Sequence, residues 1–240
     1  MVPIAANLQA VLQRIERAAV AAGRNPQSVR LLAVSKTWPS ACVEAAFRAG
    51  QPAFGENQEQ EAARKIAALA HLPIEWHFIG PVQSNKTRSV AERFAWLHSL
   101  EREKVARRLS EQRPESLPPL MVCIQVNVSG ESTKSGVSPA NAFELARIVA
   151  ELPGLRLRGL MTIPAPSDDP VVQRSQFRRL HDLFTELKTR GLDLDTLSMG
   201  MSDDLEAAIL EGATLVRVGT AIFGRRAGAG EAFKLDSVDH

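Results

Sequence analysis

The feature that most constrains this chain is its regular alternation of short apolar runs with segments of helical character. Runs of strand length recur eight times, and a helical segment follows each of the first seven. The expected strands are 31–34, 52–57, 74–80, 94–99, 120–127, 155–163, 197–199 and 215–219. This alternation is typical of parallel strands joined by helical crossovers. Because no internal repeat or long linker interrupts it, the pattern predicts a single (β/α)8 TIM barrel of the α/β class.

The expected domain is single and spans 1–240. An amphipathic helix over 4–22 precedes the first strand, and a short tail covers 225–240. An open doubly wound sheet is the alternative architecture for the same alternation. No Gly-x-Gly-x-x-Gly fingerprint follows the first strand, and this favours the barrel.

Composition excludes several classes of function. The 240 residues include 29 basic and 27 acidic ones, a formal net charge of +2 that is too balanced for nucleic acid to be the main partner. No apolar run reaches membrane-spanning length, so no membrane partner is expected. The two cysteines form neither a disulfide framework nor a metal-binding spacing, and the first residues do not resemble a signal peptide. We therefore expect a cytoplasmic protein without a metal site.

A lysine, Lys36, stands at the carboxyl end of the first expected strand. One interpretation is a surface lysine whose aliphatic stem packs along the strand exit. In α/β barrels, however, the carboxyl ends of the strands carry the active site. Barrel closure would also place the last strand beside the first, about 4.8 Å away. Lys36 would then face the segment 217–220.

The loops after the seventh and eighth strands are a recurrent phosphate site in this fold. Here the first loop contains Met201 and Ser202, and the second contains Gly219 and Thr220. Backbone amides beside a glycine, together with hydroxyl groups, suit an anion. The structural alternative is that Ser202 caps a helix over 203–211 and that Gly219 only allows a turn. Two such loops flanking a lysine favour the phosphate site.

Arg217 alternates with valines on the eighth strand, and if it points into the barrel its charge needs an acceptor. A carboxylate such as Glu206 or Glu211 is one candidate, and the ring nitrogen of a ligand is the other. A lysine able to form an imine, a phosphate site and a partner for a ring nitrogen together suit pyridoxal 5′-phosphate (PLP).

Two further polar patterns have structural interpretations. Asn57 and Gln60 resemble a capping pair at the start of a helix over 58–70. His77 and His98 are expected to be core or rim residues rather than bases, because nothing in the sequence pairs them.

The residues singled out above lie in longer motifs: AVSKT (33–37), FGEN (54–57), WHFIGP (76–81), QSNK (83–86), VN (126–127), KSG (134–136), RGLM (158–161), LSMGMSDD (197–204) and VRVGTAIFG (216–224). With these motifs nearly the whole chain closely resembles the pyridoxal phosphate homeostasis protein family, the YggS-like proteins. The resemblance implies a barrel like the N-terminal domain of alanine racemase (PLP fold type III). It also implies an imine between PLP and Lys36, and phosphate contacts from Ser202, Gly219 and Thr220. Arg217 would face the pyridine nitrogen, and Asn57 and Ser198 would line the pocket.

The resemblance further implies a protein that buffers PLP and delivers it to apo forms of PLP-dependent enzymes, without catalysis of its own. We expect a monomer or a weak dimer. Some family members carry a second lysine two positions after the imine lysine, where this chain has Trp38. Lys86, Lys134 and Lys234 are further lysines whose part in cofactor transfer the sequence leaves open.

Two enzymatic alternatives stay open. A PLP-dependent amino-acid racemase needs an acid or base on each face of its substrate. In the racemases that this barrel resembles, a tyrosine from a second domain serves one face. This chain contains no tyrosine, and the residues after Gly224 are too few for such a domain. An aldolase-type enzyme would instead form its imine with a sugar carbonyl, and it would be colourless where the carrier and the racemase are yellow.

Overall fold

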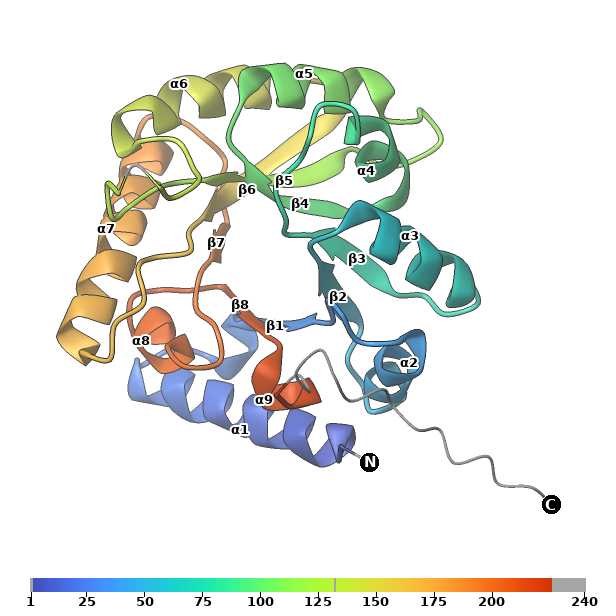
Figure 1. The fold of residues 1–240 in the computed structure, drawn as a ribbon. Helices are drawn as coiled ribbons and strands as arrows, with labels where there is room; N and C mark the ends of the chain where they lie inside the picture. The colour runs from blue at the N-terminus through green and yellow to red at the C-terminus, as the bar shows by residue number, and fades with distance from the viewer. Residues whose placement is uncertain (1, 132, 226–240) are drawn as a thin grey trace.

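The structure, a computed structural model, describes residues 2–131 and 133–225. Eight parallel strands form a closed barrel, in which each strand pairs with the next and the last pairs with the first (Figure 1). The strands are β1 (Arg30–Val34), β2 (Ala53–Glu56), β3 (Glu75–Phe78), β4 (Trp96–Leu100), β5 (Leu120–Gln125), β6 (Leu155–Met161), β7 (Thr196–Ser198) and β8 (Leu215–Val218). The predicted barrel is confirmed. An open sheet is excluded, because its first and last strands would not pair.

Helices lie around the outside of the barrel, as Figure 1 shows. They are α1 (Ile4–Ala21), α2 (Ser40–Arg48), α3 (Glu59–Ala68), α4 (Thr87–Arg93), α5 (Glu103–Gln112), α6 (Pro139–Ala150), α7 (Pro170–Thr189), α8 (Leu205–Leu210) and α9 (Thr220–Phe223). The helices bury apolar residues on their inner sides and expose polar residues to water. Within the part of the chain that the structure describes, no helix has both the length and the apolar character to cross a bilayer.

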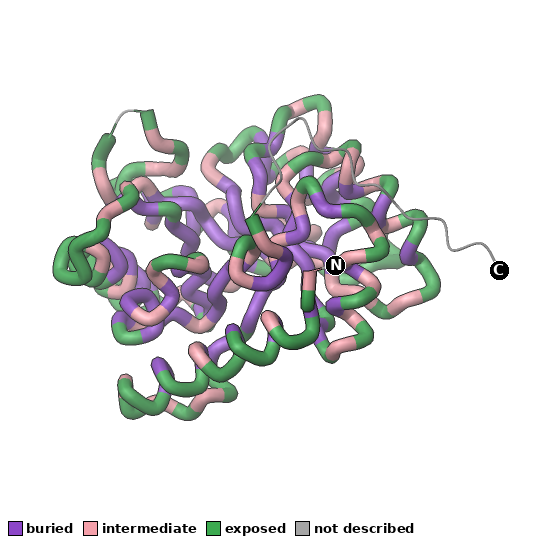
Figure 2. Tube along the Cα trace, turned by 60° about the horizontal axis from the view of Figure 1, so that its bottom comes forward, coloured by how far each residue is buried: buried purple, intermediate pink, exposed green. Residues whose placement is uncertain are grey.

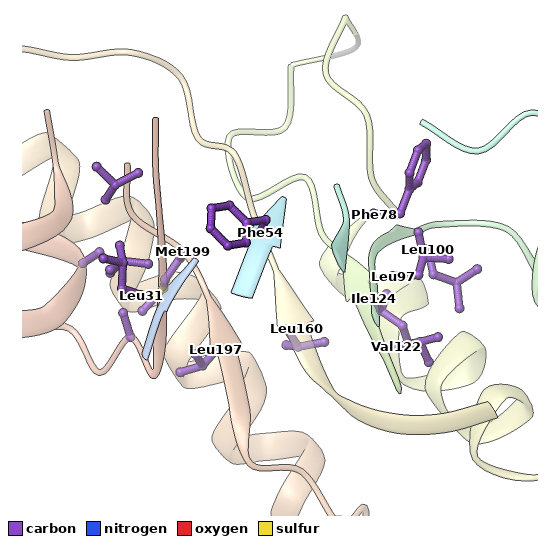
Figure 3. Packing of buried hydrophobic residues seen from close by; sticks show 14 of the residues in the cluster. Leu31, Phe54, Phe78, Leu97, Leu100, Val122, Ile124, Leu160, Leu197 and Met199 are labelled. Atoms are coloured by element: carbon purple, nitrogen blue, oxygen red, sulfur yellow. The ribbon is translucent and has the colours of Figure 1, made fainter. Parts of the chain in front are cut away.

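Strand residues alternate between the inside of the barrel and the layer beneath the helices, as the two-residue period of a strand requires. In β1, Leu31 and Ala33 belong to the main core under the helices, whereas Leu32 packs with Ala53 and Leu215 inside the barrel. Figure 2 shows the buried residues gathered in the strands and on the inner sides of the helices. Figure 3 shows the packing of the main core at close range.

The interior of the barrel is only partly apolar. Its buried polar side chains include one from each of four strands: His77, His98, Ser198 and Arg217. Burying such groups is costly unless they are hydrogen-bonded. The contacts among these side chains therefore determine how this part of the barrel interior is arranged.

Closure of the barrel joins the two ends of the sequence. Ala33 of β1 lies opposite Val218 of β8, so the turn after β1 and the start of α9 are neighbours at the carboxyl end. Gly219 between β8 and α9 approaches β1 closely, since a Cβ atom on it would stand 3.0 Å from the carbonyl oxygen of Val34. Thr220 begins the short helix α9.

Candidate functional site

A cavity of about 380 Å³ lies at the carboxyl end of the barrel. Small-molecule sites typically measure about 300 to 1,000 Å³. Most of the site residues predicted from the sequence line this cavity: Lys36, Asn57, Met201, Ser202, Arg217, Gly219 and Thr220. The remaining one, Ser198, contacts Arg217 from the end of β7. Barrel closure has thus brought residues from both ends of the sequence to one space.

Lys36 is half-buried and lies in the turn between β1 and α2. Val34 lines the cavity, and Lys36, two residues further on, lines it as well. The next residue, Thr37, has a φ of +70°, in the left-handed region that β-branched residues rarely adopt. Trp38 is buried and stacks on Phe223 of α9, with 6.0 Å between the ring centroids. The lysine is therefore carried by a turn with an unusual backbone that packs against the end of the barrel.

Arg217 points into the barrel and is almost completely buried. Its Nη1 donates to the carbonyl oxygen of Ser198 at 2.6 Å and to the Ser198 Oγ at 2.7 Å, and its Nη2 donates to the carbonyl oxygen of Thr162 at 2.8 Å. The proposal that Glu206 or Glu211 accepts its charge is wrong. Glu206 pairs with an arginine of α1, and Glu211 pairs with two arginines of α7. Neutral oxygens hold the guanidinium instead.

Burial lowers the pKa of the Arg217 guanidinium to about 10, because it removes the charge from water. The group still carries its charge at neutral pH. A guanidinium has donors only, so a ligand atom that meets Arg217 must accept a hydrogen bond. An unprotonated ring nitrogen is such an acceptor.

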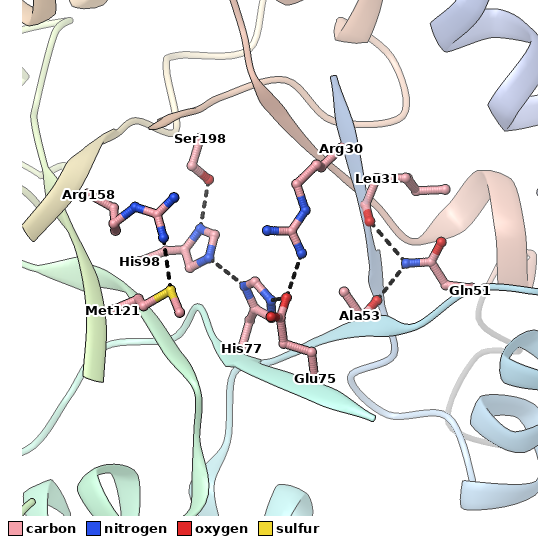
Figure 4. Close-up of polar contacts among 10 residues, drawn as sticks. All are labelled: Arg30, Leu31, Gln51, Ala53, Glu75, His77, His98, Met121, Arg158 and Ser198. Atoms are coloured by element: carbon pink, nitrogen blue, oxygen red, sulfur yellow. Dashed lines mark hydrogen bonds and ion pairs between the residues drawn. The ribbon is translucent and has the colours of Figure 1, made fainter. Parts of the chain in front are cut away.

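Ser198 also begins a chain of buried side chains that runs across the barrel interior (Figure 4). Its Oγ lies 2.7 Å from Nδ1 of His98, and Nε2 of His98 lies 2.8 Å from Nδ1 of His77. Nε2 of His77 in turn lies 2.8 Å from Oε1 of Glu75. The prediction that the two histidines are core or rim residues is confirmed, because both are buried, and the neighbouring strands β3 and β4 place them side by side.

The charge states of these side chains allow hydrogen bonds to be donated along the series in only one direction. Burial lowers the pKa of His77 and holds the pKa of His98 well below its ordinary value, so both rings are neutral. The hydrogen bond from His77 lowers the pKa of Glu75 to about 2, so this carboxylate is ionised and only accepts. Since Arg217 only donates, one assignment of hydrogens satisfies every pair. Arg217 donates to Ser198, the serine to His98, His98 to His77, and His77 to Glu75.

The two loops expected to bind phosphate lie together at the cavity. The amide of Ala221 in α9 donates to Oγ of Ser202 at 3.4 Å, and Arg14 of α1 holds the Ser202 carbonyl oxygen at 2.9 Å. The prediction that Ser202 caps the following helix is wrong, because a turn intervenes and Asp204 is the N-cap residue of α8. The carboxylate of Asp204 accepts the N–H of Met201 at 2.5 Å within that turn. The Ser202 hydroxyl therefore contacts the first turn of α9 and not that of α8.

Asn57 lines the cavity beyond the end of β2. It does not cap α3, whose N-cap residue is Gln58, so the expected capping pair is wrong. The Oδ1 of Asn57 is buried and has no hydrogen-bond partner among the described residues. The Asn57 backbone is held by close packing, since a Cβ atom on Gly80 would stand 2.1 Å from its carbonyl oxygen. Asn57 therefore brings a buried acceptor without a described partner to the wall of the cavity.

Sequence reasoning missed a buried cluster of charges behind the Lys36 turn. Glu56 at the end of β2 and Glu61 in α3 both pair with Lys65 of α3. One signal was available: Glu56 is a carboxylate at the end of an apolar strand, and a buried carboxylate needs a partner. Nothing in the sequence shows that Lys65 is that partner.

The other lysines lie elsewhere. Lys86 pairs with Glu59 of α3 at 3.4 Å, and Lys134 lies in the loop after β5; neither lines the cavity. The tail after Arg225, including Lys234, lies outside the described residues.

Comparison with known proteins gives consistent matches along the whole barrel. The chain matches the family model "Alanine racemase, N-terminal domain" over residues 6–227. It is 60% identical over 226 residues to the pyridoxal phosphate homeostasis protein of Pseudomonas aeruginosa, covering 94% of this chain and 97% of that protein. The protein of the same name from Escherichia coli K12 is 54% identical over 226 residues, covering 93% and 97%.

Solved structures also match this chain. PipY of Synechococcus elongatus PCC7942 with PLP bound is 38% identical, with a TM-score of 0.77, and the match covers 88% of this chain and 99% of that one. Alanine racemase from Corynebacterium glutamicum is 20% identical, with a TM-score of 0.70, over 95% of this chain and 64% of that one. The second match shows a shared fold only.

Proposed function

Because this chain belongs to the alanine racemase N-terminal domain family and, within it, to the pyridoxal phosphate homeostasis proteins, we propose that it binds PLP and serves PLP homeostasis without efficient catalysis. One observation carries the proposal. A single cavity is lined by Lys36, Arg217 and both loops expected to bind phosphate. The protein acts in the cytoplasm, and apo forms of PLP-dependent enzymes receive the cofactor from it.

The residues at the cavity fit the chemistry of PLP. The buried Oδ1 of Asn57 needs a donor, and PLP carries a ring hydroxyl. Arg217 has N–H groups beyond the three that Ser198 and Thr162 accept, and the pyridine nitrogen would accept one of them. The hydroxyls of Ser202 and Thr220 and the closely packed backbone at Gly219 suit the phosphate. Met201 adds an apolar side chain at the rim, where it is partly exposed.

Lys36 is the residue that holds the cofactor covalently. Its Nζ, as the neutral amine, would hold the cofactor at its aldehyde carbon, with the carbonyl oxygen lost as water. When bound, PLP supplies an electron sink for reactions at an amino-acid α-carbon. Arg217 keeps its charge and donates only, so it disfavours a proton on the ring nitrogen and weakens that sink.

A racemase needs a second acid or base besides the lysine, opposite the substrate's other face. The chain has no tyrosine for this role. His77, a conceivable substitute, is 0% exposed and is engaged by His98 and Glu75 on its two ring nitrogens. The described part of the cavity therefore supports a carrier better than a racemase.

The carrier function predicts negligible exchange at the α-carbon of amino acids. With PLP-loaded protein in D2O, we expect exchange of the α-hydrogen of alanine far below the roughly 10 s⁻¹ that is typical of enzymes. Proton NMR of L- and D-alanine, with Lys36→Ala as the control, measures it. Rapid exchange with inversion, lost in the variant, would restore the racemase.

The phosphate loops predict a difference between phosphorylated and unphosphorylated ligands. Ser202→Ala and Thr220→Val should each weaken PLP relative to pyridoxal by roughly tenfold, the cost of one hydrogen bond to a charged group. Because Ser202 does not cap α8 and its Oγ accepts the Ala221 amide only at 3.4 Å, a long hydrogen bond, its replacement should cost less than about 1 kcal/mol of the free energy of unfolding. Fluorescence titration with both ligands checks this, with Ser138→Ala at an exposed site as the control. Equal loss for both ligands would place the phosphate elsewhere.

A further inference from the structure

The turn that carries Lys36 is held from behind by buried charges. Nζ of Lys65 donates to the Ser35 carbonyl oxygen at 2.7 Å, to Oε1 of Glu56 at 2.8 Å and to Oε1 of Glu61 at 2.6 Å. The side chains of Lys65 and Glu56 are only 7% and 0% exposed. Such a cluster has a fixed geometry, because each buried charge depends on the partners that hold it.

The same cluster anchors both neighbours of Lys36. On one side, the Ser35 hydroxyl donates to Oε1 of Glu56 at 2.6 Å, and the Ser35 carbonyl oxygen accepts from the ammonium group of Lys65. On the other side, the backbone N–H of Thr37 donates to Oε1 of Glu61 at 2.6 Å. Lys36 therefore lies between two residues that are tied to α3 and β2.

Thr37 requires such an anchor. Its φ of +70° is disfavoured for a β-branched residue, and conformations of this kind persist only where the surroundings impose them. Without the Glu61 contact the turn could relax to an ordinary backbone conformation. The side chain of Lys36 would then point in a different direction and would no longer line the cavity.

We propose that Glu61 and Lys65 are positioning residues, which hold this turn so that Nζ of Lys36 reaches the aldehyde of the bound cofactor. The inference rests on the proposed attachment of PLP to Lys36. Neither Glu61 nor Lys65 lines the cavity. They affect the bond between Lys36 and the cofactor, and they do not affect the protein's contacts with the ring and phosphate of the cofactor.

The test compares two ligands that differ at the aldehyde. PLP can bond to Lys36, whereas pyridoxine 5′-phosphate carries an alcohol at the same carbon and cannot. Glu61→Ala should weaken PLP by about tenfold, as expected for a lost hydrogen bond to a charged group, and should change pyridoxine 5′-phosphate less than about twofold. The visible absorption band and the adduct that borohydride fixes at Lys36 measure how much of the cofactor is covalently bound.

Three further variants sharpen the result. Glu61→Gln keeps an oxygen that can accept the Thr37 N–H, and it should lose less PLP affinity than Glu61→Ala. Glu59→Ala removes another carboxylate from the first turn of α3 without touching the Lys36 turn, and it should change neither ligand. In the Glu61→Ala protein, a second change of Thr37→Gly should recover most of the affinity, because glycine adopts positive φ without strain.

The outcomes separate this inference from the proposed function. If the wild-type protein forms no borohydride-stable adduct at Lys36, the attachment itself is wrong. If the adduct forms but Glu61→Ala weakens both ligands equally or neither, the positioning role is overturned. Failure of Thr37→Gly to recover affinity would also overturn it.

Discussion

Replacing Lys36 with alanine is expected to abolish the visible absorption band of the PLP-loaded protein and the adduct that borohydride fixes. The reason is that Lys36 lines the same cavity as the two expected phosphate loops, where we propose that it forms an imine with the cofactor aldehyde. Losing this intramolecular bond should weaken PLP by at least about tenfold. The residual affinity should match that for pyridoxine 5′-phosphate. Absorption spectra and mass spectrometry of the reduced, digested protein measure both effects.

Lys86→Ala and Lys134→Ala are the matched controls for this experiment, because both lysines lie outside the cavity. Their spectra should equal that of the wild type. PLP should also raise the melting temperature of the wild type and of both controls, since a ligand that binds only the folded state stabilises it. An adduct that maps mainly to Lys86 or Lys134 in the wild-type protein would contradict the assignment.

Replacing Gly159 with alanine is expected to cost more than about 4 kcal/mol of the free energy of unfolding, or to prevent folding altogether. Gly159 of β6 lies opposite Thr196 of β7, and a Cβ atom on it would stand 1.7 Å from the Thr196 carbonyl oxygen. Because the obstacle is backbone within a closed barrel, β7 would have to move, and Ser198 with it. Urea unfolding followed by circular dichroism measures the loss.

Gly191→Ala is the control for this prediction. Gly191 follows α7 with a φ of +95°, but nothing lies within 4 Å of the Cβ position. Only the backbone strain of a left-handed residue is added there, about 1 kcal/mol. Equal losses of unfolding free energy for Gly159→Ala and Gly191→Ala would contradict the prediction that the close backbone contact at Gly159 causes the larger loss.

The sequence by itself determined the barrel and the place of its site. Strand-length apolar runs with intervening helical segments leave few architectures, and a closed parallel barrel puts every carboxyl strand end on one rim. Lys36, Ser202 and Gly219 could be grouped on that basis, because each lies at the carboxyl end of an expected strand or in the loop that follows it. Grouping them needed only the order of the elements and not the direction of any side chain. Capping at Asn57 and Ser202 was predicted wrongly, because α3 begins one residue later than expected and a turn precedes α8.

Only the tertiary structure decided which polar side chains meet inside the barrel and behind the site. The contact of His77 with His98, and the hold of Ser198 on Arg217, depend on how far neighbouring strands are staggered, which sequence periodicity does not specify. The same holds for Lys65, which reaches Glu56 and Ser35 across the packing of α3 on the barrel. Long charged side chains find their partners through three-dimensional distances of a few ångströms, and residues far apart in the chain carry no local signal of such a pair.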